Sequence, residues 1–115
     1  MVRRSVIEAW PTDDSQRVDL IPSRRRGVRG VEIDDESVLY DERDGRLHLL
    51  NWSASAVWWS IDGIASVDAL AGDLANRFHA DPDAMRTDVI GLLDVLGAQQ
   101  LVVAVQPGRT RNNDA

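Results

Sequence analysis

The sequence predicts one α+β domain in which a three-stranded antiparallel sheet is followed by three helices. Two observations lead to this fold class. Between residues 28 and 51, short β-forming segments are separated by turn residues at hairpin spacing. From residue 53 to residue 97, the apolar side chains recur with the 3.6-residue period of helices. A chain of 115 residues is long enough for one domain with a modest core.

The expected strands cover residues 28–33, 37–42 and 46–51, which are rich in β-branched and aliphatic side chains. An Asp-Asp pair at residues 34–35 predicts a tight turn between the first two strands. An Asp-Gly pair at residues 44–45 predicts a hairpin, because glycine adopts positive φ without steric cost. The three strands therefore form a small antiparallel meander.

The expected helices cover residues 54–61, 67–79 and 82–97. Each is preceded by a residue whose side chain can accept a hydrogen bond from the first turn. Three short helices and a small sheet resemble a winged helix-turn-helix fold in which the sheet comes first. The residues expected to cap the helices are Ser53, Ser66 and Asp81, the last followed by Pro82.

The two ends of the chain differ in composition from this central part. Residues 1–27 lack sustained periodicity and contain two prolines and several charged runs, so we expect a flexible arm that is dispensable for folding. Residues 106–115 form a polar segment that predicts a disordered tail. The folded domain is expected to span residues 28–105, with a short return strand at residues 100–105.

The composition excludes several classes of protein. The 19 acidic and 13 basic residues give a net charge of −6, whereas nucleic-acid-binding proteins are usually basic. The absence of cysteine excludes disulfides and thiolate chemistry. No segment approaches the roughly 20 apolar residues that cross a bilayer. We therefore expect a soluble, cytoplasmic protein that does not act on membranes or nucleic acids.

The residue types and spacings predict no catalytic chemistry. His48 and His79 are the only histidines and lack the paired spacing of metal ligands. The carboxylates cluster at turns, where they are usually solvated, and no general base follows Ser53 or Ser55 at a motif spacing. The glycine-rich pattern of a phosphate-binding loop is absent. We therefore expect no catalytic residue, no metal and no cofactor, so that the protein is not an enzyme.

Three tryptophans lie close together around the first helix. Trp58 is expected to face the core, whereas Trp59 points about 100° away along the same helix. Trp52 follows the third strand, and both core packing and partial exposure remain open for it and for Trp59. These aromatic side chains are expected to anchor the helix against the sheet.

Several motifs, taken in order, resemble those of the coenzyme PQQ synthesis protein D (PqqD-like) family. They are "ESVLYD" (36–41), "LLN" (49–51), "SAVWWSIDG" (55–63), "SVDALAGDLANRF" (66–78) and "DVIGLLDVL" (88–96). The resemblance covers about residues 28–103. This family is the prototype of the recognition elements of ribosomally synthesised and post-translationally modified peptides, known as RiPPs.

The resemblance implies a β-β-β-α-α-α domain without catalytic activity that binds the leader segment of a precursor peptide. Such domains present the peptide to a modifying enzyme, often a radical SAM enzyme. The leader is expected to lie as an extra strand along the third strand, in a groove whose other wall is the third helix. The implied peptide-binding residues are Arg46, Leu47, His48, Leu49, Leu50 and Asn51 of the strand, and Arg86, Val89, Ile90, Leu93 and Gly97 of the helix.

Physical reasoning independently favours this mode of binding. The third strand ends the meander, so one of its edges is unpaired unless another segment covers it. An exposed edge can accept a peptide as an additional strand. In this arrangement Arg86 is expected to meet an acidic leader residue, and Ile90 and Leu93 are expected to seat aliphatic ones. For Val89 and Leu93, a purely structural role in the core remains open.

Two other functions are compatible with parts of the sequence. One is a winged-helix DNA-binding regulator that uses the basic segment "RRRGVR" at residues 24–29. Arg77 and Arg86 are the only cations in the second and third helices, which is few for a recognition helix. The other is a module that pairs edge to edge with a second copy of the chain. For the oligomeric state, we expect a monomer or a weak dimer.

Overall fold

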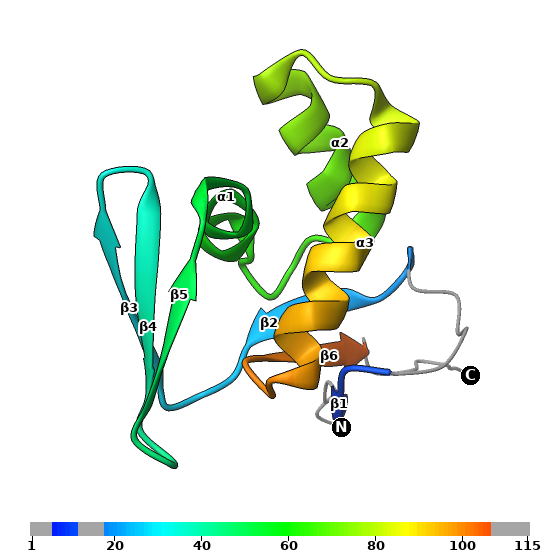
Figure 1. Ribbon diagram of the computed structural model, residues 1–115. Coiled ribbons are helices and arrows are strands. Elements are labelled where there is room, and N and C mark those ends of the chain that lie inside the picture. Colours follow the sequence, from blue (N-terminus) through cyan, green and yellow to red (C-terminus); the bar gives the residue numbers. More distant parts are fainter. Residues whose placement is uncertain (1–5, 12–17, 107–115) are drawn as a thin grey trace, which may run out of the picture.

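The computed structural model describes residues 6–11 and 18–106, which form two three-stranded antiparallel sheets and three helices (Figure 1). In chain order the elements are β1 (Val6–Ala9), β2 (Ile21–Arg24), β3 (Val28–Ile33), β4 (Glu36–Asp41), β5 (Arg46–Leu50), α1 (Trp52–Ser60), α2 (Val67–Phe78), α3 (Pro82–Ala98) and β6 (Val102–Gln106). From β3 to α3, this order confirms the predicted succession of three strands and three helices. A second sheet was not predicted.

The sheet of β3, β4 and β5 is the predicted meander, with β4 in the centre. Asp34 and Gly45, which lie in its two turns, have φ values of +57° and +74°. Alternate side chains point to opposite faces, as the pleat requires. Leu39 and Leu50 therefore lie on the inner face and are buried.

The first helix begins earlier than the sequence predicts. Asn51, rather than Ser53, caps α1, because its side chain accepts a hydrogen bond of 2.9 Å from the backbone N–H of Ala54. Ser53 lies within the first turn, where its hydroxyl donates to the Asn51 side chain. The other two predicted caps are confirmed: Ser66 begins α2 and Asp81 begins α3. Strand β5 therefore passes into α1 through a single residue.

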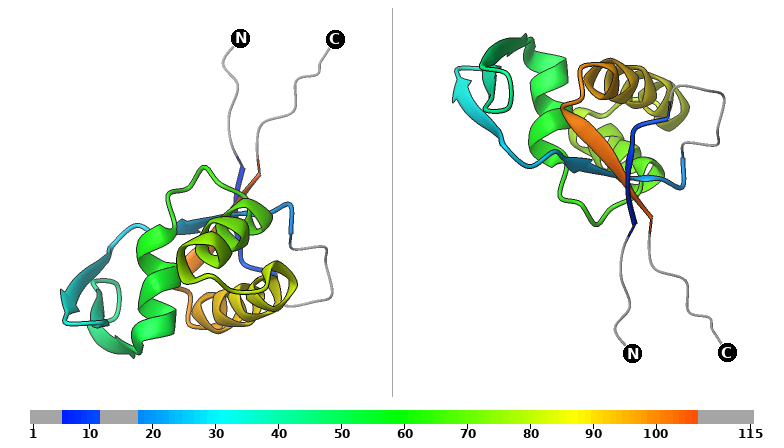
Figure 2. Two further views of the ribbon diagram at one scale, coloured as in Figure 1. Left: turned by 90° about the horizontal axis from the view of Figure 1, so that it is seen from above. Right: turned by 90° about the horizontal axis from the view of Figure 1, so that it is seen from below.

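The helices pack as a layer beside the meander, with α1 between that sheet and the pair formed by α2 and α3 (Figures 1 and 2). Trp58 points into this core and is 1% exposed, as predicted. Trp59 is 38% exposed and donates from Nε1 to the Ser37 hydroxyl at 2.8 Å. Trp52 is largely exposed. Other fully buried residues include Leu39, Val67, Leu74, Val89, Leu93, Leu96 and Leu101.

The second sheet has the order β1-β6-β2 and joins the two ends of the chain. β6 is its central strand and pairs antiparallel with both neighbours, so that Ala9 lies opposite Val103. The expected return strand near residues 100–105 is therefore confirmed.

The expectation of a flexible arm at residues 1–27 is wrong for residues 6–11 and 18–27, which include β1 and β2. Residues 1–5, 12–17 and 107–115, including most of the expected tail, lie outside the described residues. The arm was misassigned because two four-residue strands show little periodicity by themselves. They are stabilised by pairing with β6, from the other end of the chain.

Trp10 attaches this second sheet to α3. Its side chain is 4% exposed, and its Nε1 donates to Asp94 Oδ1 at 2.8 Å. Gly97 provides the necessary space, because a Cβ atom at this position would lie 2.5 Å from Trp10 Cβ. Trp10, which directly follows β1, is therefore part of the hydrophobic core.

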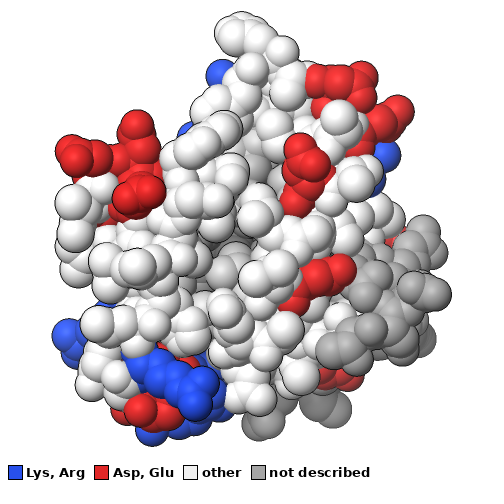
Figure 3. Space-filling model, viewed as in Figure 1, with Lys and Arg blue, Asp and Glu red and all other residues white. Residues whose placement is uncertain are grey.

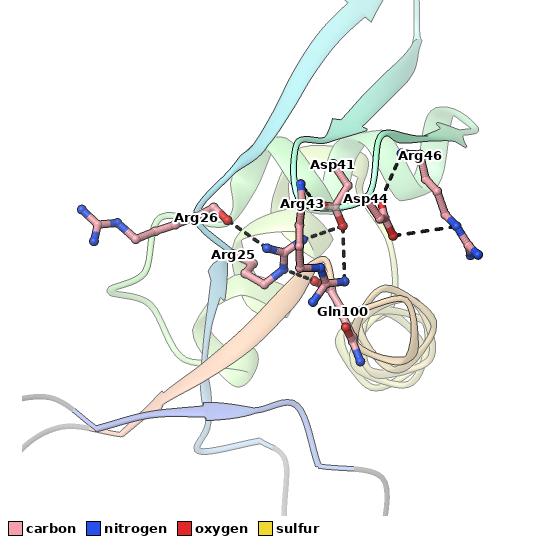
Figure 4. A network of polar contacts seen from close by, with 7 residues as sticks. All are labelled: Arg25, Arg26, Asp41, Arg43, Asp44, Arg46 and Gln100. Atoms are coloured by element: carbon pink, nitrogen blue, oxygen red, sulfur yellow. Dashed lines mark hydrogen bonds and ion pairs between the residues drawn. The ribbon is translucent and has the colours of Figure 1, made fainter.

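A buried carboxylate connects the two sheets (Figure 4). Asp41 ends β4 and forms ion pairs with Arg25, which follows β2, and with Arg43 in the β4–β5 turn. Arg25 also donates from Nε to the backbone carbonyl of Gln100, just before β6. The hydrogen bond from Arg25 is the main reason that the pKa of Asp41 lies below its ordinary value.

Candidate groove beside strand β5

Strand β5 is an edge strand, since β4 is the only strand that pairs with it among the described residues. Its free edge faces the side of the molecule on which α3 lies (Figure 1). The space-filling view shows a hollowed band between the sheet and α3 (Figure 3). We call this band the β5–α3 groove. It contains one hollow lined by the amino end of β5 and one, lined by α1, α2 and α3, beyond the carboxyl end of β5.

The first hollow, near the carboxyl end of β5, has a volume of about 350 Å³ and is mostly apolar. Trp52 and Phe78 form part of its wall, with their rings edge to face and their centroids 6.2 Å apart. Both side chains are substantially exposed. We call it the apolar hollow, and its lining residues are Trp52, Ser53, Ala56, Val57, Leu74, Phe78, Ala80, Met85, Asp88, Val89 and Leu92.

The second hollow, near the amino end of β5, has a volume of about 380 Å³ and is mostly polar. Arg46 lies 3.8 Å from Asp44, and Arg43 lies 3.5 Å from the buried Asp41. The Nε2 atom of His48 is buried and has no hydrogen-bond partner among the described residues. We call it the polar hollow, and its lining residues are Arg43, Asp44, Arg46, His48, Ala98, Gln99 and Gln100.

Of the predicted strand residues, Arg46 to Leu50 form the edge strand β5, and Asn51 follows it. Arg46 and His48 line the polar hollow on the inner side of the sheet. Leu47 and Leu49 point to the outer face and are 65% and 80% exposed. The remaining two have structural roles, since Leu50 is buried in the core and Asn51 caps α1.

Of the predicted residues of α3, only Val89 lines one of the two hollows. Val89 and Leu93 are fully buried, which supports their role in the core, although Val89 also contributes to the floor of the apolar hollow. Arg86 contacts Asp68 of α2, with a hydrogen bond of 2.9 Å. Ile90 packs partly buried against the core, and Gly97 contacts Trp10.

The face of α3 that borders the groove carries Met85, Asp88 and Leu92, and Gln99 follows directly after the helix. The sequence-based assignment instead gave the groove a stripe from Arg86 to Gly97 that contains the buried Val89 and Leu93. The available signal was the spacing of Met85, Asp88 and Leu92 at i, i+3 and i+7, which a helix places along one side.

The described part of the chain contains no group of three or more His, Asp or Glu side chains arranged to hold a metal ion. Within the same residues, no helix has both the length and the apolar character that a membrane span requires. The features that distinguish the groove are the unpaired edge of β5 and the two hollows, one apolar and one polar.

These features define a class of small α+β domain in which an open edge strand borders a helical groove. The family model for "Coenzyme PQQ synthesis protein D (PqqD)" matches residues 36–102, which is more than half of the 115-residue chain. The chain belongs to the PqqD family. Strands β1, β2 and β3 precede the matched segment. No curated protein sequence matches the chain.

Three solved structures share the fold. TbiB1 in complex with the TbiA(beta) leader peptide is 20% identical, with a TM-score of 0.62 over 69% of this chain and 92% of TbiB1. Lasso peptide synthetase B1 complexed with the leader peptide is 19% identical, with a TM-score of 0.60 over 72% of this chain and 96% of that one. The PqqD truncation of Methylobacterium extorquens PqqCD, a stand-alone RiPP recognition element, is 27% identical. Its TM-score is 0.63 over 76% of this chain and 92% of that one.

Proposed function

We propose that this protein is a non-catalytic peptide-binding domain that captures the leader of a ribosomally made precursor peptide and presents it to a modifying enzyme. The observation that carries the proposal is the free edge of β5 beside the β5–α3 groove. Two of the structural neighbours contain a leader peptide, and the third is a recognition element. A radical SAM enzyme is the kind of modifying enzyme that we propose as partner.

The leader would add to β5 as a fourth strand. Main-chain hydrogen bonds to the free N–H and C=O groups of β5 would supply affinity without requiring a particular sequence. An antiparallel orientation is favoured, because antiparallel pairing is slightly more stable per residue than parallel pairing. Alternate leader side chains would then point toward the helices, where the two hollows lie.

No observation favours the alternative of a DNA-binding regulator. Arg77 contacts Asp73 and the Ser60 hydroxyl, and Arg86 contacts Asp68 and Asp83. Both cations of α2 and α3 are therefore engaged within the protein. Recognition helices need several free cationic or polar side chains for phosphates and base edges.

The proposal is tested by amide hydrogen exchange, measured by NMR with and without a synthetic peptide that corresponds to the leader segment of a candidate precursor peptide. Strand addition is expected to protect every second amide of residues 46–50, because alternate amides of an edge strand point outward. The amides of β3, the opposite edge of the same sheet, serve as the internal control. Unchanged exchange in β5, or protection confined to β3, would overturn the proposal.

A further inference from the structure

We propose that the polar hollow is a subsite for an acidic side chain of the bound peptide, and that this residue follows an apolar one by four or six positions. The inference rests on the proposed function, since it assumes that a peptide pairs with β5. It adds a sequence requirement that strand addition alone does not impose.

The charge of the polar hollow indicates an anion as its occupant. Its lining residues carry the guanidinium groups of Arg43 and Arg46 and the carboxylate of Asp44. Together with the buried Asp41 and its partner Arg25, the cluster holds three guanidinium groups and two carboxylates. This local excess of positive charge occurs in a chain whose net charge is −6. The space-filling view shows a cluster of basic side chains at the lower left, with a few acidic atoms among them (Figure 3).

The side chains of the polar hollow can bind a carboxylate. Arg46 is 76% exposed and is held only loosely by Asp44, at 3.8 Å, so its guanidinium can turn toward a ligand. A guanidinium presents two parallel N–H donors to a carboxylate. His48 also lines the hollow, but its Nε2 atom is buried, so the contact with the carboxylate is assigned to Arg46.

The apolar hollow has the opposite preference. Of its eleven lining residues, only Ser53 and Asp88 are polar. Burial of an acidic side chain there would cost its hydration, and Asp88 would repel it. An apolar side chain would fill the hollow favourably, so the two hollows impose one register on the peptide.

The spacing follows from helix and strand geometry. Along α3, the apolar hollow is bordered by residues 85–92 and the polar hollow by residues 98–100, about ten residues apart, which is roughly 16 Å at about 1.5 Å per residue. At about 3.3 Å per residue, a strand covers this distance in about five residues. Side chains that share one face are separated by an even number, so the spacing is four or six.

The order of the two residues follows from strand direction. The apolar hollow lies at the carboxyl end of β5 and the polar hollow at its amino end. A peptide that runs antiparallel to β5 reaches the apolar hollow first. Its apolar residue therefore precedes the acidic one.

The inference is tested by selecting 12-residue peptides from a random mRNA-display library with the full-length protein. The expected result is enrichment of a bulky apolar residue followed, four or six positions later, by Asp or Glu. The same selection with Arg46→Glu is expected to lose the acidic preference and keep the apolar one. Arg29→Glu is the matched control, because Arg29 is equally exposed but lies on the outer face of the sheet, paired with Glu42.

Affinities of one selected acidic peptide complete the test. Arg46→Glu is expected to weaken binding about fivefold to tenfold, the range for converting one exposed attractive charge pair into a repulsive one, and Arg29→Glu is expected to leave it unchanged. Selected peptides that protect β5 amides but show no acidic preference, or show it at odd spacing, would overturn this inference and leave the proposed function intact. Selected peptides that do not protect β5 would overturn both.

Discussion

The two sheets of this protein have the same number of strands but differ in what they expose. In the sheet β1-β6-β2, Pro22, Val102 and Ala104 are buried, and Trp10 fixes the sheet to α3. In the sheet β3-β4-β5, the outer face is open to solvent and the edge of β5 borders a groove. The exposed apolar residues of that outer face are Val31, Ile33, Tyr40, Leu47 and Leu49.

This difference indicates a division of roles between the sheets. The sheet β1-β6-β2 joins segments from both ends of the described chain and contributes to the core. The sheet β3-β4-β5 keeps its edge and its outer face available. Substitutions in the buried part of β1-β6-β2 should therefore change stability, whereas substitutions on the exposed parts of β3-β4-β5 should change binding.

The largest effect is expected for Trp10→Ala. Removal of this buried side chain should leave a cavity between the N-terminal segment and α3 and lower the free energy of unfolding by about 3–5 kcal/mol. Trp52→Ala, which removes the same side chain from an exposed position, should cost much less. Urea denaturation measures both values, and equal midpoints would show that the attachment of the sheet β1-β6-β2 through Trp10 does not contribute to stability.

A smaller effect is expected for Gly97→Ala, which tests the contact between α3 and Trp10. The new Cβ would lie 2.5 Å from Trp10, so overpacking should cost about 1–3 kcal/mol. Gly91→Ala, in the same helix but with no atom within 4 Å of the new Cβ, should instead stabilise the protein by up to about 1 kcal/mol. Thermal unfolding distinguishes the two variants. If both substitutions change the melting temperature in the same direction, Gly97 is not packed against Trp10 as described.

The link between the sheets is tested by acid unfolding of Asp41→Asn. The folded-state pKa of Asp41 is lowered by Arg25, so its carboxylate stabilises the protein above the ordinary pKa of 3.8. This contribution is lost as the pH falls through that value toward the lowered one.

The variant should be less stable than the wild type near pH 7, and its melting temperature should depend less on pH below about 4. Asp44→Asn, an exposed turn carboxylate, is the matched control. If the melting temperature of Asp41→Asn falls below about pH 4 as steeply as that of the wild type, Asp41 does not link the sheets.

The smallest effect on stability is expected for Leu49→Ser. Leu49 is 80% exposed on the outer face, so this substitution should change the free energy of unfolding by less than about 0.5 kcal/mol. Leu39→Ser, which places the same change on the buried inner face of the neighbouring strand, should be strongly destabilising. A comparable loss in both variants, measured by urea denaturation, would show that the outer face is covered.

The sequence alone was sufficient for the elements between β3 and α3. Their signals are local, because an Asp-Gly pair specifies a hairpin and Ser66 and Asp81 each satisfy N–H groups of the turn that follows. The burial of Trp58 also followed from its position on a single helical face. The family resemblance rested on the same continuous segment, which the family model also matches.

Tertiary structure decided the remaining features, because they depend on residues far apart in the chain. β1 and β2 become strands only through pairing with β6. Both sides of α3 carry apolar residues, so only the packing of α2 and Trp10 on one side leaves Met85, Leu92 and Gln99 to border the groove. The polar hollow forms where the β4–β5 turn meets the end of α3. These two segments are about 50 residues apart in the sequence, and only the compact fold brings them together.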